Sequence, residues 1–400
     1  YMANYESMFS LVDVIPDGYF DMVIADEAHR IGSPRSRQTK KIVDKFENTK
    51  YKYVVTGTLN ANNAMSFFMP FRFMGPDMMR EANFYEFRSR HFLAVDPDQH
   101  IWVPTGSTYS HVQELIGNAS VCFKKEDCLD LPDKVYQEYV CDMSKDQNVE
   151  YLRVLEDMMF ILKEGCASCE KNGAKCDWVC ENAILIKNAL VKNSKLAQIT
   201  CGFFIETKYE VTPEGRKVDK SEAHFFDDNP KLDLLMSTIA NIPADKKIII
   251  WSNFTAAIKL IEQRLQKAYG GDSYLLVYGD VDAFEAVEKF KIDPKKRFFV
   301  ANPEKAGTGL NIQFSNYQIF FSKNYSYRSR QQAEDRQHRQ GQKNVVTVID
   351  VMCDDTIDLH IQDILKDKME LDKSLNTLAR VGGFDELGKN IEHYRRICNH

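Results

Sequence analysis

The feature that most constrains the fold of this 400-residue chain is a series of mainly apolar runs that alternate with helical segments. Each run is short enough for one strand and is followed by a polar motif or a helical pattern. The runs are Phe20–Ala25, Tyr51–Val55, Lys247–Trp251, Arg297–Ala301, Tyr317–Phe321 and Val345–Val351. Strands that alternate with helices are typical of open parallel sheets covered by helices. The sequence therefore predicts an α/β fold.

Length and composition narrow the class of protein. The chain is long enough for two or three domains, and its 44% apolar and 28% charged residues are ordinary for a globular protein. The formal net charge of −6 argues against a protein that coats nucleic acid through its overall charge. A local basic groove is still compatible with this net charge. No apolar run reaches the roughly 20 residues that span a bilayer, and no signal-peptide pattern opens the chain. We therefore expect an intracellular protein without a membrane partner.

Two adjacent carboxylates follow the first apolar run, in the sequence Asp26-Glu27-Ala28-His29. Ligands of parallel α/β sheets gather at the carboxyl ends of the strands. One carboxylate there can hold Mg²⁺ while its neighbour orients an attacking water. A plain acidic turn is the alternative. The second run ends in Thr56-Gly57-Thr58, which is a weak signal by itself.

The stretch Gln331–Gln342 carries Arg336 and Arg339, three residues apart. On a helix this spacing places both guanidinium groups on one face, where they can brace a transferring phosphoryl group. The alternative is a solvated charged helix. Cations outnumber acids locally, since only Glu334 and Asp335 oppose Lys323, Arg328, Arg330, Arg336, Arg339 and Lys343.

Four of the ten cysteines cluster, as Cys166-x2-Cys169-x6-Cys176-x3-Cys180. Four thiolates within so few residues can close a tetrahedral Zn²⁺ site. Free thiols or a redox pair are the alternative. We expect a structural zinc in a scaffold, in a DNA-facing knob or in a contact with a protein partner.

Further along, helical patterns cover the stretch from Ser144 to about Leu196, and Glu206–Phe226 reads as a hairpin or a loop. Ser252 and Asn253 either cap the next helix or lie along DNA. The glycines of Gly307-Thr308-Gly309 let backbone amides approach an anion, and we expect a helix to begin after them.

The order of these motifs resembles the Swi/Snf-like family of superfamily-two helicase-type DNA-dependent ATPases. The resemblance rests on Asn4–Met8, Asp26–His29, Thr56–Thr58, Leu131–Lys134, Gly307–Asn311 and Gln332–Gln342. It implies two RecA-like lobes with parallel sheets, the first incomplete at its N-terminus, plus helical insertions and a small zinc-binding insert with four cysteine ligands. The expected domains are residues 1–130 for the first lobe, 131–228 for a lead-in strand with helical and zinc insertions, 229–352 for the second lobe and 353–400 for a helical tail.

The resemblance also implies roles for individual residues, with ATP, Mg²⁺ and structural Zn²⁺ as cofactors and double-stranded DNA as partner. Asp26 would hold Mg²⁺, Glu27 would position water, and Arg336 and Arg339 would reach the γ-phosphate. Nucleotide binding and coupling would involve His29, Thr56, Thr58, Gly307, Gly309 and Gln332. DNA contacts would come from Ser252, Asn253, Lys305 and Thr308.

Two departures from the family pattern stand out. Leu59 and Ala61 replace the usual residues after Thr-Gly-Thr, and no Gly-x-x-x-x-Gly-Lys-Ser/Thr loop occurs in the sequence. We therefore expect a fragment that begins after the phosphate-binding loop and is inactive alone. The predicted function is an ATP-dependent DNA translocase, with a strand-separating helicase or a non-catalytic DNA- or protein-binding scaffold as alternatives. We expect a phage or bacterial member that works in the bacterial cytoplasm.

Overall fold

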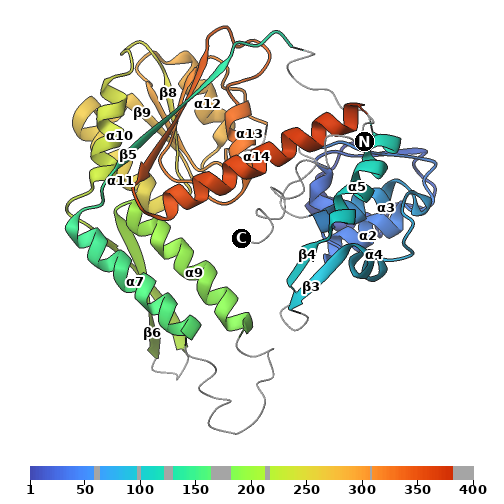
Figure 1. The fold of residues 1–400 in the computed structure, drawn as a ribbon. Coiled ribbons are helices and arrows are strands. Elements are labelled where there is room, and N and C mark those ends of the chain that lie inside the picture. The colour runs from blue at the N-terminus through green and yellow to red at the C-terminus, as the bar shows by residue number, and fades with distance from the viewer. Residues whose placement is uncertain are drawn as a thin grey trace. The chain divides into compact units, whose positions relative to one another are not determined.

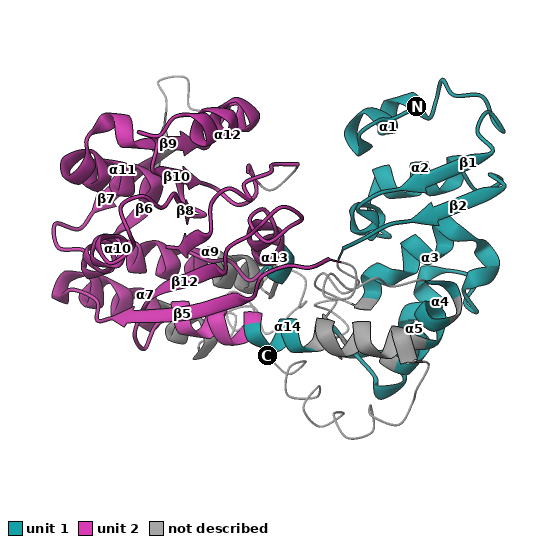
Figure 2. Ribbon diagram, turned by 90° about the horizontal axis from the view of Figure 1, so that it is seen from above, with its two compact units in different colours: residues 1–123, 326–328, 366–400 teal, residues 124–325, 329–365 magenta. Residues whose placement is uncertain are grey.

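The computed structural model divides the chain into two compact units (Figure 2). Unit 1 comprises residues 1–123, 326–328 and 366–400, and unit 2 comprises residues 124–325 and 329–365. The structure describes residues 1–57, 64–96, 101–120, 129–163, 182–211, 217–306 and 309–381.

The first part of the chain is mainly helical around two parallel strands. Its helices and strands are α1 (Tyr5–Leu11), β1 (Met22–Ala25), η1 (Ala28–Ile31), α2 (Arg37–Lys45), β2 (Tyr51–Val54), η2 (Ala64–Phe67), α3 (Phe68–Met74), η3 (Pro76–Met78), α4 (Phe84–His91), β3 (Phe92–Asp96), β4 (Ile101–Pro104) and α5 (Gly106–Ala119). Strands β1 and β2 pair in parallel, with Met22 opposite Tyr51. The core packs aromatic side chains of α3 and α4 against α2 and α5. This packing places the turn after β1 on a fixed scaffold.

The rest of the chain alternates strands and helices. Its elements are β5 (Lys134–Cys141), α7 (Lys145–Lys163), α9 (Asn182–Thr200), β6 (Phe203–Val211), β7 (Lys217–Phe225), α10 (Pro230–Ala240), β8 (Ile248–Trp251), α11 (Thr255–Tyr269), η4 (Gly271–Ser273), β9 (Tyr274–Val277), α12 (Ala283–Ile292), β10 (Phe298–Ala301), β11 (Tyr317–Phe320), α13 (Tyr327–Asp335), β12 (Val346–Cys353) and α14 (Ile357–Val381). Strands β6 and β7 form an antiparallel hairpin, as one of the two readings of Glu206–Phe226 expected.

A six-stranded parallel sheet in the order β5-β12-β11-β8-β10-β9 is the centre of unit 2. Alternate residues of each strand face opposite layers, because side chains in a strand point to the two faces in turn. Ile250 and Val300 pack with α10 and α11, whereas Ile249 and Phe299 pack with α12 and α13 (Figure 1). The predicted α/β fold with parallel strands is confirmed.

The apolar runs predicted from the sequence of unit 2 form the buried central strands of this sheet. Every residue of β8 and β10 is buried, and each β12 residue except Thr347 is buried. Among the described helices, none combines the length and apolar character needed to cross a membrane.

Candidate nucleotide and DNA site

The acidic motif in unit 1 lies directly at the carboxyl end of β1. The Val55 amide donates to the Ala25 carbonyl oxygen at 2.9 Å, and the Ala28 amide donates to the Val55 carbonyl oxygen at 3.0 Å. These bonds extend the β1–β2 pairing past the strands. They hold Asp26 and Glu27, the predicted acidic pair, in a defined turn at the edge where parallel sheets bind ligands.

Glu27 adopts a backbone conformation that side chains rarely take. Its φ of 50° and ψ of 51° lie in the left-handed region, and one of the Asp26 carboxylate oxygens accepts its amide at 2.8 Å. A non-glycine residue in this region carries strain that the surrounding structure must overcome, and such residues cluster at functional sites. The backbone of this turn is therefore defined, and one Asp26 carboxylate oxygen is held by the Glu27 amide.

His29 and Tyr5 both lie next to this turn. His29 Nδ1 lies 3.2 Å from a Glu27 carboxylate oxygen. The Tyr5 hydroxyl donates to the Asp26 carbonyl oxygen at 2.6 Å. Burial, reinforced by the nearby Asp26 charge, raises the pKa of Tyr5 to about 12, so the phenol stays a donor at neutral pH. Tyr5 was not among the predicted site residues, although it lies in one of the motifs that carry the resemblance.

Polar residues follow three neighbouring strands of unit 2 at their carboxyl ends. The Asn253 amide donates to Ser322 Oγ at 2.8 Å, and Asn253 Nδ2 donates to the Ser322 carbonyl oxygen at 3.3 Å. Ser252 Oγ lies 3.1 Å from Ser322 Oγ. The expectation that Ser252 and Asn253 cap the next helix is wrong, because α11 begins after Phe254 without a side-chain cap. Both bond to Ser322, two residues past the end of β11, and Ser252 Oγ also accepts the Phe254 amide at 3.4 Å.

Asn302 links this cluster to the loop that carries Lys305. Its Nδ2 donates to the Asn253 carbonyl oxygen at 3.0 Å, and its Oδ1 accepts the Lys305 amide at 3.4 Å. Lys305 itself is exposed. Neither Asn302 nor Ser322 was predicted, although each follows an apolar strand, which was the available signal.

Gly309 has a φ of +79°, a left-handed value that glycine adopts without strain. The expected helix after this glycine motif is wrong, since residues 310–316 form a turn that leads into β11. Leu310 and Ile312 are buried in the core of unit 2. The Ile312 amide donates to the Arg336 carbonyl oxygen at 3.1 Å, which fixes this non-helical segment against the turn after α13.

The stretch with the two predicted arginines is only partly helical. Helix α13 carries Gln332 and ends at Asp335, so Arg336 and Arg339 lie in the turns that follow it. The prediction that both occupy one helical face is wrong. The reason is a tertiary anchor at Gln337, which is fully buried and donates through Nε2 to Ser315 Oγ and to the Tyr317 carbonyl oxygen, both at 2.9 Å.

A second anchor lies beyond Arg339. Gln342 is buried and donates to the Ser315 carbonyl oxygen at 2.9 Å, while Gly341 between the anchors has a φ of +98°. Arg339 donates to Asn311 Oδ1 and, at 3.4 Å, to the Leu310 carbonyl oxygen. The turn is therefore defined by hydrogen bonds on both sides of Arg339, and the Arg339 side chain is half-buried.

Two of the cations counted in the local basic stretch are internal. Arg330 Nη1 and Nη2 donate to the two carboxylate oxygens of Asp350 at 2.5 and 3.0 Å, and its Nε donates to Glu334 at 2.7 Å. Lys323 lies 3.3 Å from Asp350. Burial lowers the pKa of Lys323 to about 8, with Asp350 opposing the shift. These two charges fasten α13 to the sheet and do not contribute to a surface groove.

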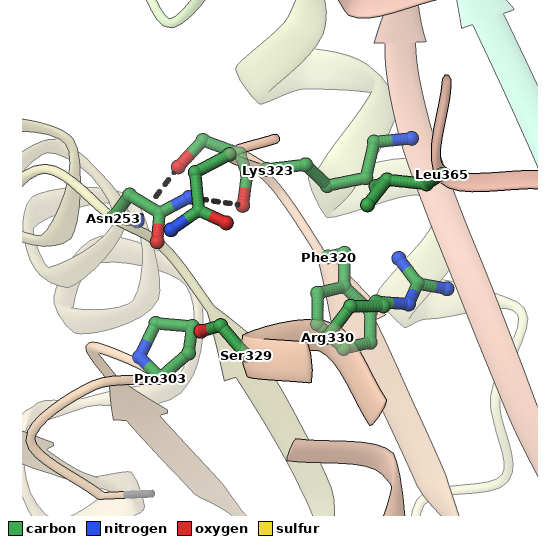
Figure 3. Close-up of a pocket in the computed structure, with 9 residues that line it drawn as sticks. Asn253, Pro303, Phe320, Lys323, Ser329, Arg330 and Leu365 are labelled. Atoms are coloured by element: carbon green, nitrogen blue, oxygen red, sulfur yellow. Dashed lines mark hydrogen bonds between the residues drawn. The ribbon is translucent and has the colours of Figure 1, made fainter. Parts of the chain in front are cut away.

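A small pocket in unit 2 opens beside this network (Figure 3). Its lining includes Asn253 and Ser322, which follow strands β8 and β11, and Ser329 and Arg330 of α13. The pocket thus brings a predicted DNA-contacting residue, Asn253, near the helix that carries Gln332. Thr58, Gly307, Thr308 and the four clustered cysteines, Cys166, Cys169, Cys176 and Cys180, lie outside the described residues.

Comparison with protein families matches both halves of the chain. The SNF2-related domain matches residues 1–199, and the helicase conserved C-terminal domain matches residues 230–341. The parallel sheet and these two matches define the class as a helicase-type motor built from two RecA-like lobes.

Related proteins are similar over nearly the whole chain. The TATA-binding protein-associated factor mot1 of Schizosaccharomyces pombe is 23% identical over 92% of this chain and 20% of its own length. The ATP-dependent helicase brm of Drosophila melanogaster is 24% identical over 98% of this chain and 24% of its own length. The chain thus spans a fifth to a quarter of these relatives. The dsDNA complex of the Sulfolobus solfataricus SWI2/SNF2 ATPase core is 20% identical, covers 97% of this chain and 76% of its own, and gives a TM-score of 0.42. The chain belongs to the Swi/Snf-like family of superfamily-two helicase-type ATPases.

Proposed function

We propose that this chain is the motor part of an ATP-driven translocase that moves along double-stranded DNA. The observation that carries the proposal is the Asp26–Glu27 turn at the carboxyl end of β1, in which Glu27 has a left-handed backbone and an Asp26 carboxylate oxygen accepts the Glu27 amide. Asp26 is exposed and offers the oxygen ligand that Mg²⁺ takes. When bound with ATP, Mg²⁺ would neutralise charge on the phosphates.

The residues of each unit have separable tasks in this proposal. Glu27 would orient the attacking water. His29, whose Nδ1 lies 3.2 Å from a Glu27 carboxylate oxygen, would respond to whether that carboxylate binds the water. In unit 2, Arg336 and Arg339 would stabilise charge that develops on the γ-phosphate. The anchored turn around Arg339 supports this role, because a fixed backbone lowers the cost of presenting a guanidinium to phosphate.

The cluster at the carboxyl ends of β8, β10 and β11 is the proposed path of one DNA strand. Backbone amides, hydroxyls and one exposed cation are the groups that bind phosphates without reading sequence. The half-buried Asn253 side chain and the exposed Lys305 would supply such groups, and Asn302 and Ser322 hold them in place. Ser252 is fully buried, so it would act on this path only through its contact with Ser322. The mouse RAD54-like relative, 23% identical over 99% of this chain, is described as a DNA repair and recombination protein, which supports a DNA substrate.

Movement without strand separation is the expected activity. With ATP, the full product of the gene should displace the third strand from a DNA triplex. It should not separate the strands of a duplex that carries a single-stranded overhang. Fluorescently labelled strands resolved on native gels measure both reactions. Separation of the duplex would favour the helicase alternative, and absence of both ATP hydrolysis and displacement would favour the scaffold alternative.

Lys305→Ala should weaken binding of the 400-residue chain to duplex DNA by a similar factor for every sequence tested. Removing one phosphate-contacting cation should lower the slope of log affinity against log salt by about 1. Fluorescence anisotropy from about 50 to 200 mM salt measures this. Lys267→Ala, which removes an exposed cation at the end of α11, is the matched control and should keep the wild-type slope. An unchanged slope in the Lys305 variant would remove this loop from the DNA path.

A further inference from the structure

Three potential metal ligands meet inside unit 1, away from the acidic turn. Glu81 lies just before α4, His91 is the last residue of α4, and His111 lies on α5. Their side chains are 1%, 8% and 7% exposed, respectively. Histidine and glutamate are mostly placed at the surface, so three of them buried together need a physical reason.

The atoms that could bind a metal converge. His91 Nε2 lies 2.9 Å from Glu81 Oε1, and His111 Nε2 lies 3.5 Å from Glu81 Oε2. One ligand atom from each of the three residues fits within 4.8 Å of the others. The two imidazole rings stack with centroids 4.4 Å apart and planes 2° from parallel. The three ligand atoms therefore lie close together, but the stacked rings hold their nitrogen lone pairs in parallel planes, so at least one imidazole must rotate to bind the same ion.

The cluster is incompletely satisfied as it stands. Glu81 Oε2 and His111 Nε2 are both buried and have no hydrogen-bond partner. A buried polar atom without a partner is costly, and two that face each other at 3.5 Å are a strong reason to look for a missing ligand. Two ligands about 2.1 Å from a tetrahedral Zn²⁺ lie about 3.4 Å apart, which matches this separation.

The backbone around the cluster is fixed in advance. The His91 carbonyl oxygen accepts hydrogen bonds from the Thr105 amide at 2.9 Å, from Thr105 Oγ1 at 3.0 Å and from Thr108 Oγ1. These bonds join the C-terminus of α4 to the N-terminus of α5. The buried Phe87 ring lies 5.2 Å from the His91 ring and 6.4 Å from the His111 ring. Little rearrangement beyond rotation of the imidazoles is needed to bind an ion.

The cations next to the cluster are partly neutralised by other carboxylates. Arg90 contacts Glu81 Oε1 at 3.2 Å but also pairs with Glu86 at 2.9 Å, and Arg80 pairs with Glu114 at 2.6 Å. Burial lowers the pKa of His111, partly opposed by Glu81. Burial alone would raise the pKa of Glu81, but the His91 hydrogen bond and the histidine charges lower it.

We propose that Glu81, His91 and His111 form a Zn²⁺ site that ties the end of α4 to α5, with water as the fourth ligand. His91 would exchange its hydrogen bond to Oε1 for the metal, and Oε2 would become the carboxylate ligand. Two imidazoles and one carboxylate are an established protein ligand set for this ion, and they suit Zn²⁺ better than Mg²⁺ or Ca²⁺. The site is separate from the clustered cysteines.

Metal content tests this site directly. The 400-residue chain is dialysed against Zn²⁺ and then against zinc-free buffer, and bound zinc is measured by mass spectrometry. His111→Gln should hold one zinc per chain fewer than the wild type, with an unchanged circular dichroism spectrum. His224→Gln is the matched control, because His224 also lies near a glutamate, at 3.3 Å from Glu206, and should keep the wild-type content. Equal zinc in the wild type and His111→Gln would overturn the proposal.

A second measurement separates this site from the cysteines and does not depend on the histidine variant folding. With Cys166, Cys169, Cys176 and Cys180 all changed to serine, Co²⁺ should give visible d–d bands without a thiolate charge-transfer band. Zn²⁺ at about 100 times its Kd should raise the Tm of this variant by roughly 5 °C. Absence of both the bands and the Tm shift would leave a metal-free hydrogen-bonded cluster and reject the site.

Discussion

Replacing Arg339 by alanine should reduce DNA-stimulated ATP hydrolysis by a factor on the order of 10³ to 10⁵ while the protein stays folded. The reason for the loss is that a guanidinium that stabilises the transferring phosphoryl group acts mainly in the transition state. The reason for retained folding lies in the structure. Arg339 bonds only to Asn311 and the Leu310 carbonyl oxygen in the described residues, whereas Gln337 and Gln342 hold the turn independently.

Phosphate release by the full product of the gene, with saturating duplex DNA, measures this effect. Arg339→Lys keeps the charge but loses the planar fork, so it should recover only part of the rate. Lys343→Ala removes an exposed cation four residues along and should leave the rate within a factor of about two, as expected of a surface substitution away from the site. A near-wild-type rate in the Arg339→Ala variant would reject its assignment.

A double variant, in which both Arg336 and Arg339 are replaced by alanine, tests whether the two residues act together. If Arg336 and Arg339 act on the same phosphoryl group, the combined loss should be much smaller than the product of the single losses, because residues that act as a unit are not additive. A fully multiplicative loss would show that the two arginines act on separate steps. The rate measurement thus distinguishes a shared task from two independent ones.

The sheet was predictable because its signal is local. Strands β8 and β10 are apolar on both faces, and this pattern is typical of the central strands of a parallel sheet that helices cover on both sides. Strand β9 (Tyr274–Val277) was missed although it is as long as β8 and β10, and its first three residues are only half-buried. The end of α13 was misjudged for the opposite reason, since the burial of Gln337 against Ser315 depends on a contact 22 residues away.

From the sequence, the site could be predicted only as polar residue types that follow the ends of expected strands. Asp26 and Asn253 could be placed in this way, because the carboxyl end of a parallel strand is where polar residues gather. The partners that fix them could not, because Tyr5, Asn302 and Ser322 are recognisable only from contacts made in three dimensions. The same holds for Glu81, His91 and His111, whose spacings of 10 and 20 residues follow no familiar metal-binding pattern.

Arg330→Ala should lower the free energy of unfolding of unit 2 by about 3 to 5 kcal/mol at pH 7. Removing the guanidinium leaves Asp350, 1% exposed, and Glu334, 8% exposed, without their main counter-charge. Lys323 remains 3.3 Å from Asp350, and Lys134 remains 3.1 Å from Glu334, which keeps the loss from being larger. Urea denaturation followed by circular dichroism measures the change.

Arg264→Ala provides the matched control in the same unit. Arg264 pairs with Asp233 at 2.9 Å, but both side chains are exposed, at 38% and 55%. An exposed ion pair contributes roughly 0 to 1 kcal/mol, because water screens its charges. Equal losses in the Arg264 and Arg330 variants would contradict the view that burial makes the Arg330 pair important.

The pH dependence of the Arg330 effect tests whether it comes from pairing with the buried carboxylates, of which Asp350 and Glu334 both contact Arg330. Burial alone would raise the pKa of Asp350, but the charges of Arg330 and Lys323 outweigh it and lower the pKa to about 2. Because the folded-state pKa lies below the ordinary value of 3.8, this pairing stabilises the fold fully above about pH 4 and is lost as pH falls through about 2. The difference in unfolding free energy between wild type and Arg330→Ala should therefore be constant from pH 7 to 5 and shrink below pH 4. A difference that stayed constant down to pH 2 would mean that Arg330 stabilises the fold by packing on Phe320, 3.6 Å below its guanidinium, rather than by charge.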